Sequence, residues 1–218
     1  MKITVKNDIR NQKAGTIYDF SEIELLKIIP LAGDNGCGKS TLLHAIRGSF
    51  REKTHEDSLY ESGFKKLAEN FDIEHSYEKF FFFDAVKDNA LDMNVSFDAV
   101  NFLMSGGMAV KNLSHGQSSL YNISKFFKDN VDKIIPDKTL LVFDEIDNGL
   151  SLKNMKNFTN FIDNMIFKYC CHVIIASHNP FFLVQQTICY DISKQKFVPS
   201  DEYVEEITGF IIKKKPKE

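Results

Sequence analysis

The sequence predicts an α/β domain with a mostly parallel central sheet, and the alternation of two kinds of segment predicts it. Apolar runs typical of buried strands recur along the chain, at residues 25–32, 79–84, 139–143 and 171–176. Amphipathic helical patterns lie between or beside them, at residues 41–47, 118–130 and 151–169. Strands that alternate with helices form parallel sheets, whose ligands bind at the carboxyl ends of the strands.

The remaining segments complete this domain in chain order. Residues 2–6 alternate in polarity and predict an N-terminal strand, so antiparallel strands are expected before the main sheet. Residues 48–78 are polar, with turn or helical character, and the four phenylalanines within 79–84 predict a strand buried on both faces. We expect a short helical insertion at 85–112, and a helix at 180–187 followed by strands. Residues 1–218 are interpreted as a single domain, with roughly 85–130 as an inserted helical subdomain.

The composition is that of a globular protein, and the chain lacks the net positive charge that is typical of nucleic-acid-binding proteins. The chain has 218 residues, 43% apolar and 26% charged, with a net charge of −3. Its four cysteines show no C-x-x-C spacing, so neither a zinc site nor a disulfide framework is indicated, and reduced thiols are expected. Residues 1–8 do not resemble a signal peptide and no run is long enough for a membrane span, so a cytoplasmic location is expected.

One stretch between a predicted strand and a predicted helix carries the phosphate-binding pattern G-x-x-x-x-G-K-[ST]. It comprises Gly33, Asp34, Asn35, Gly36, Cys37, Gly38, Lys39, Ser40 and Thr41. The glycines allow the backbone to curl around a phosphate, and the following helix adds its positive end. Lys39 would reach the phosphates and Ser40 would ligate Mg²⁺. The alternative is a glycine-rich turn with an incidental lysine, and the flanking strand and helix favour the P-loop.

Polar residues follow two later strands. Asp144, at the end of the 139–143 run, can hold Mg²⁺, and Glu145 can polarise an attacking water as general base. The alternative for this pair is an acidic strand end that caps the next turn. His178 follows the third strand, where a neutral imidazole can hydrogen-bond a γ-phosphate, or can serve a structural role.

Ser114, Gly116 and Gln117 open the predicted helix that ends at residue 130. They form either a helix cap, with the Ser114 hydroxyl bonded to a first-turn amide, or a second phosphate site. The segment 9–12 and Tyr18 precede the P-loop, where one of them can contact adenine; a surface loop is the alternative.

The order of these motifs resembles that of the ATP-binding-cassette ATPases over about residues 25–190. The resemblance assigns Leu113–Gln117 to the signature motif within the helical insertion, Asp144–Glu145 to Walker B, Asp147 to the D-loop and His178 to the switch histidine. It implies ATP and Mg²⁺ as ligands and a head-to-tail homodimer. In that dimer each ATP lies between one P-loop and Ser114, Gly116 and Gln117 of the other subunit. Two departures are His115 within the signature and Asp84 where the family has its Q-loop glutamine.

Cassette proteins of three kinds share these motifs. The segment Ala176–Leu183 resembles the repair and antiviral-defence ATPases, which predicts a minimal soluble cassette that acts on a cytosolic protein partner. The alternative is the nucleotide-binding subunit of a transporter, which the missing Q-loop glutamine disfavours. A non-hydrolysing scaffold is disfavoured by Glu145 and His178. Nucleic-acid binding stays open, because the only basic clusters, Arg47/Arg51/Lys53 and 213–217, lack interleaved aromatics.

Overall fold

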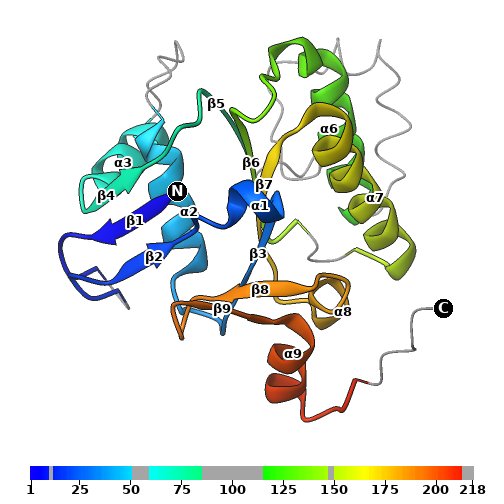
Figure 1. The fold of residues 1–218 in the computed structure, drawn as a ribbon. Coiled ribbons are helices and arrows are strands. Elements are labelled where there is room, and N and C mark those ends of the chain that lie inside the picture. Colours follow the sequence, from blue (N-terminus) through cyan, green and yellow to red (C-terminus); the bar gives the residue numbers. More distant parts are fainter. Residues whose placement is uncertain (10–11, 51–58, 85–114, 147–149, 213–218) are drawn as a thin grey trace. The chain divides into compact units, whose positions relative to one another are not determined.

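The computed structural model describes residues 1–9, 12–50, 59–84, 115–146 and 150–212 (Figure 1). The chain divides into two compact units. The first unit combines Met1–Ser76 with Ile174–Glu218, and the second is Tyr77–Val173. The helical insertion expected at 85–112 and the basic segment 213–217 lie outside the described residues, so those expectations, and the single-domain interpretation, stay predictions.

A small antiparallel sheet with the strand order β2-β1-β4 opens the first unit. It is formed by β1 (Lys2–Val5), β2 (Ile17–Asp19) and β4 (Phe71–Glu74). Ile3 and Val5 point into the core while Lys2 is exposed, as the alternating sequence predicts. The expected N-terminal antiparallel strands are therefore confirmed. The strand β4 was not predicted, because its four residues stand in a polar stretch and only Phe71 is fully buried.

A second group of strands in the first unit follows the order β7-β3-β8-β9. Its elements are α1 (Ile23–Leu26), β3 (Ile28–Ala32), β7 (His172–Ala176, whose first two residues belong to the second unit), α8 (Pro180–Leu183), β8 (Ile188–Asp191), β9 (Lys196–Pro199) and α9 (Ser200–Thr208). β3 and β8 are parallel, and β8 and β9 are antiparallel. The predicted strand at 25–32 is too long, because Leu25 and Leu26 belong to α1, which ends at Lys27 with φ 61°. The helix predicted at 180–187 stops at Leu183, and α9 was not predicted.

Two helices of the first unit, α2 (Lys39–Ser49) and α3 (Leu59–Ala68), pack closely against each other (Figure 1). Gly48 makes this possible, because a Cβ there would lie 2.2 Å from the carbonyl oxygen of Phe64. The Phe64 ring is buried and lies with its centroid 4.7 Å from the His44 ring and 4.7 Å from the Arg47 guanidinium carbon. Because α2 begins directly at the P-loop lysine, this contact supports the helix that presents the loop.

The second unit contains parallel strands and two long helices. Its elements are β5 (Lys79–Asp84), α6 (His115–Asn130), a 3-10 turn (Val131–Lys133), β6 (Thr139–Asp144), α7 (Leu152–Tyr169) and the start of β7, with the strand order β5-β6-β7. β5 and β6 are parallel, so the α/β class with mainly parallel main-sheet pairs is confirmed. None of the described helices combines the length and the apolar character that a membrane span requires.

Aromatic rings form the core between the strands and helices of the second unit. The Phe83 ring stacks on Phe143 at 5.0 Å and packs edge-on against Phe126 at 5.3 Å. Two expectations are wrong here. Residues 80–82 are half-buried rather than buried on both faces, because β5 ends the strand order and has a single neighbouring strand among the described residues. Leu152, expected to face inward, is 64% exposed at the start of α7, whereas the other predicted core positions of α7 are buried.

Candidate phosphate-binding site

The loop between β3 and α2 has the curled backbone that the glycine pattern predicts. Gly33, Gly36 and Gly38 have φ angles of 147°, 80° and 104°, which residues with a side chain rarely adopt. A Cβ on Gly33 would also lie 2.6 Å from the Cys37 sulfur. Asp34, Asn35 and Gly36 are exposed, so the loop is open to a ligand. The sequence at 33–38 therefore folds into a turn that requires glycine at its bends.

Lys39 is the buried cation of this loop. Its side chain is 4% exposed, and its ammonium donates hydrogen bonds to the carbonyl oxygens of Gly33 at 2.7 Å and Asp34 at 3.1 Å. Lys39 is also the first residue of α2, whose N-cap, Gly38, offers no side-chain cap. Ser40 and Thr41 follow in the first helical turn and are half-buried. A fixed ammonium beside the positive end of a helix is suited to a polyphosphate.

His178 meets this lysine within the first unit. Its Nδ1 atom lies 3.4 Å from the Lys39 ammonium nitrogen. An ammonium has no acceptor, so Nδ1 accepts and the proton of the neutral imidazole is on Nε2. The turn that carries His178 is fixed on both sides, since the Ser177 hydroxyl accepts from the Asn179 amide at 3.0 Å and Asn179 caps α8. His178 is exposed, with Nε2 as its remaining donor.

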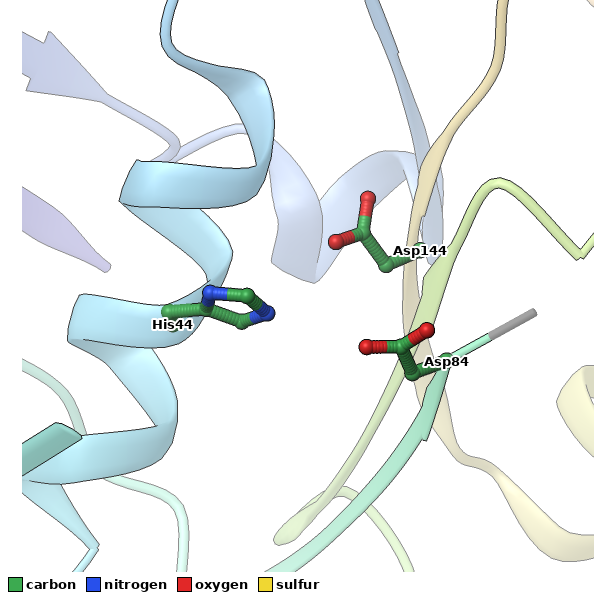
Figure 2. A group of neighbouring side chains, drawn as sticks. All are labelled: His44, Asp84 and Asp144. Carbon is green, nitrogen blue, oxygen red and sulfur yellow. The ribbon is translucent and has the colours of Figure 1, made fainter. Parts of the chain in front are cut away.

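Two carboxylates end the paired strands of the second unit (Figure 2). Asp84 of β5 stands opposite Asp144 of β6 in the parallel register, and an oxygen of each lies within 4.8 Å of the other. Asp144 is 6% exposed and β6 is buried along its whole length. His44, also drawn in Figure 2, belongs to the first unit. Two carboxylates this close, one buried and one half-buried, favour a bound cation.

Glu145, directly after β6, has an unusual backbone. Its φ angle is 54°, in the left-handed region that side chains other than Asn and Asp seldom occupy. Such a conformation costs about 1–3 kcal/mol and is found at functional sites more often than elsewhere. The side chain is half-buried. Residues 147–149, which include the predicted D-loop aspartate, lie outside the described residues.

The predicted signature residues are only partly within the described chain. Ser114 lies outside it, while Gly116 and Gln117 occupy the first turn of α6, with side chains that are not described. The second phosphate site therefore stays a prediction.

The segment 9–12 contains a site residue that sequence reasoning did not assign to the loop. Gln12 is 2% exposed and donates from Nε2 to the carbonyl oxygen of Gly38 at 3.2 Å. A glutamine in a polar stretch gives no sequence signal for such burial. Tyr18, the other candidate for an adenine contact, is buried, and that burial, followed by the nearby Cys37, raises the pKa of its hydroxyl. Its ring therefore offers no exposed face for stacking.

No protein-family model matches the sequence, and neither does any curated protein. Three solved structures are similar to this chain in fold. The first is the dimeric post-hydrolysis state of the ATP-binding cassette MJ0796 bound to ADP and Pi, with a TM-score of 0.50 and 12% identity over 92% of this chain and 99% of that chain. The second is an inward-facing putative metal-chelate type ABC transporter, with a TM-score of 0.47 and 20% identity over 82% and 76%.

The third is CbiO1 from Clostridium perfringens, part of the ABC transporter complex CbiONQ, with a TM-score of 0.45 and 18% identity over 84% and 79%. The likeness to MJ0796 extends over nearly the whole of both chains. The P-loop of the first unit and the mainly parallel strand pairs belong to this fold. The chain therefore has the fold of an ATP-binding cassette.

Proposed function

We propose that this protein binds Mg·ATP and hydrolyses it to ADP and phosphate. The observation that carries the proposal is the P-loop, where three left-handed glycines and the buried Lys39 ammonium form a phosphate receptor at the start of α2. A nucleoside triphosphate supplies the negative charge that complements this cationic receptor. The cassette fold supports the same conclusion.

The paired carboxylates at the ends of β5 and β6 have the chemistry that a magnesium ion requires. Mg²⁺ prefers oxygen ligands, and the proposal assigns it the hydroxyl of Ser40 and the carboxylate of Asp144. Asp84 offers a second carboxylate beside Asp144 in place of the family's glutamine. When bound, the ion would neutralise charge on the phosphate oxygens.

The proposal gives catalysis to Glu145 and His178. Glu145, directly after β6, would accept the proton of the attacking water. His178 would donate from Nε2 to the γ-phosphate, because its Nδ1 is already the acceptor for Lys39. The bond between His178 and Lys39 supports this assignment, since it holds the imidazole beside the cation that binds phosphate.

Dimerisation is the next step of the proposal. Each ATP would be held between the P-loop of one subunit and Ser114, Gly116 and Gln117 of a second copy. The solution mass of the Glu145→Gln variant tests this, because a variant that binds ATP without hydrolysing it should accumulate as a dimer. We expect a monomer without ATP and a dimer with Mg·ATP. An unchanged mass at saturating ATP would refute the homodimer.

We propose a soluble protein partner in the cytoplasm, and the resemblance to the repair and antiviral-defence ATPases suggests a role in nucleic-acid maintenance or defence. The four cysteines are all free, as in a reducing compartment, and Asp84 replaces the glutamine at which transporter cassettes meet their membrane subunit. The ATP-trapped Glu145→Gln dimer is a suitable bait. Recovery of a membrane-spanning partner from detergent extracts would instead establish the transporter alternative.

ATP binding and phosphate release by purified variants test the enzymatic proposal. Lys39→Ala should lose most ATP affinity, while Glu145→Gln should bind ATP and lose turnover by about 100-fold or more. Lys13→Ala, an exposed lysine of the same unit, is the matched control and should behave as the wild type. Retained turnover in Glu145→Gln removes that residue as the base, and ATP affinity in Lys39→Ala equal to that of Lys13→Ala removes the P-loop assignment.

A further inference from the structure

Gln12 contacts the P-loop from a part of the chain that the proposed chemistry does not use. From this contact we infer that Gln12 is a positioning residue of the phosphate-binding loop, which holds the Gly38–Lys39 peptide in the orientation that binds phosphate. The inference rests on the proposed nucleotide-binding function and deepens it. It concerns the shape of the loop and not a contact with adenine.

The backbone of Gln12 is fixed before its side chain reaches the loop. Ile9 and Gln12 exchange backbone hydrogen bonds of 2.9 and 2.8 Å, which pair these two residues in an isolated antiparallel bridge after β1. From there the side chain runs inward, and its Nε2 atom meets the carbonyl oxygen of Gly38 at 3.2 Å. The approach depends on glycine, because a Cβ on Gly38 would lie 2.6 Å from that nitrogen.

The Gly38 carbonyl controls the direction of an amide that faces the proposed ligand. A peptide group is planar and trans, so the carbonyl of Gly38 and the N–H of Lys39 point in opposite directions. This carbonyl accepts from the amide of Leu42 at 2.9 Å, the ordinary first bond of a helix, and additionally from Gln12. The second bond restrains rotation of the peptide, so the Lys39 amide is aimed before the phosphate arrives.

A purely structural role does not explain the choice of glutamine. The Oε1 atom of Gln12 is buried and has no hydrogen-bond partner within the described part of the chain. A buried amide with one unsatisfied oxygen is a net cost to folding, whereas an apolar side chain of similar length would fill the space without it. Glutamine at this position therefore lowers the stability of the fold, and residues that do so are expected where the function of a site requires them.

The Gln12→Met variant tests this, because methionine keeps the length of the side chain and removes both polar groups. The matched control is Gln185→Met, since Gln185 also donates its Nε2 to a backbone carbonyl, that of Phe181 at 3.1 Å, but lies in the turn after α8. Calorimetric affinities for ATP and for inorganic tripolyphosphate, together with the melting temperature, are measured on the full chain. Tripolyphosphate is included because it engages the loop without any nucleoside.

We expect Gln12→Met to keep or raise the melting temperature and to bind both ligands about tenfold more weakly, the loss that one hydrogen bond explains. Gln185→Met should bind both as the wild type does. Unchanged affinity overturns the inference, as does a loss confined to ATP, which would indicate a nucleoside contact, or a loss that accompanies a lowered melting temperature. If the wild type binds neither ligand, the proposed function itself fails together with the inference. If the wild type binds and Gln12→Met binds equally well, only the inference fails.

Discussion

Replacement of Gly48 by alanine is expected to destabilise the protein through the contact between α2 and α3. The added Cβ would lie 2.2 Å from the carbonyl oxygen and 2.6 Å from the carbonyl carbon of Phe64, and 2.9 Å from the Cβ of Ala68. Two of these three atoms belong to the backbone, so no side-chain rotation relieves the overlap. The helices would have to separate by roughly 1 Å to restore an ordinary van der Waals distance.

The magnitude follows from two opposed effects. Overpacking a close contact costs about 1–3 kcal/mol, and the backbone overlap at Gly48 places this case at the upper end. Alanine in a helix recovers about 0.5–1 kcal/mol relative to glycine. The net loss is therefore about 2 kcal/mol, which lowers the melting temperature of a chain of this size by roughly 4–8 °C.

Gly63→Ala is the matched control, because it makes the same substitution in the partner helix α3. A Cβ at Gly63 meets nothing within 4 Å, so only the helix-propensity gain remains and the melting temperature should rise by about 1–4 °C. Thermal unfolding followed by circular dichroism measures both variants. Equal shifts of the two melting temperatures would refute the close contact between α2 and α3.

Three further predictions concern buried side chains. Burial raises the pKa of the Cys171 and Cys189 thiols to about 12 and about 11, so iodoacetamide at pH 8 should modify them only when the protein is unfolded, as mass spectrometry can measure. Burial also raises the pKa of Tyr190 to about 12. The protonated Tyr190 hydroxyl therefore contributes its full stability below pH 10, and the free energy of unfolding should fall as the pH rises from 10 to 12. This fall should be less steep in the Tyr190→Phe variant. Phe158→Ala should lose about 3–5 kcal/mol in urea unfolding, whereas Phe167→Ala, at a side chain that is 92% exposed, should change stability by less than about 0.5 kcal/mol.

The P-loop was predictable because its conformation depends on local residue types. Glycine at 33, 36 and 38 is needed for left-handed φ angles, and each angle is left-handed in the structure. The apolar strand before the loop and the amphipathic helix after it are likewise short-range patterns. The sequence therefore contains both the loop geometry and its setting, and the structure places Lys39 and His178 together as the strand ends suggest.

Elements defined by distant partners were not predictable. The strand β4 is held by β1, more than sixty residues earlier, and its own four residues show too short an alternation to be recognised. Leu152 has the right helical spacing for a core position but lies at the first turn of α7 and is 64% exposed. Periodicity reports which face of a helix is apolar and not how far along that face the neighbours reach.

The burial of Gln12 and the backbone conformation of Glu145 are features of the site that the sequence did not predict. Each breaks a local rule: Gln12 buries an unsatisfied oxygen, and Glu145 adopts a left-handed backbone without being glycine. Local preference predicts an exposed glutamine and an extended or helical glutamate, so the sequence indicates neither the burial of Gln12 nor the backbone conformation of Glu145, although its motif predicts the role of Glu145. A residue held against its preference requires a compensating interaction, and in proteins such violations concentrate at functional sites. The buried, unsatisfied oxygen of Gln12 is therefore an argument for the site that does not depend on the motifs, whereas the left-handed backbone of Glu145 also occurs at Lys27, Asp137, Cys170 and Gln195.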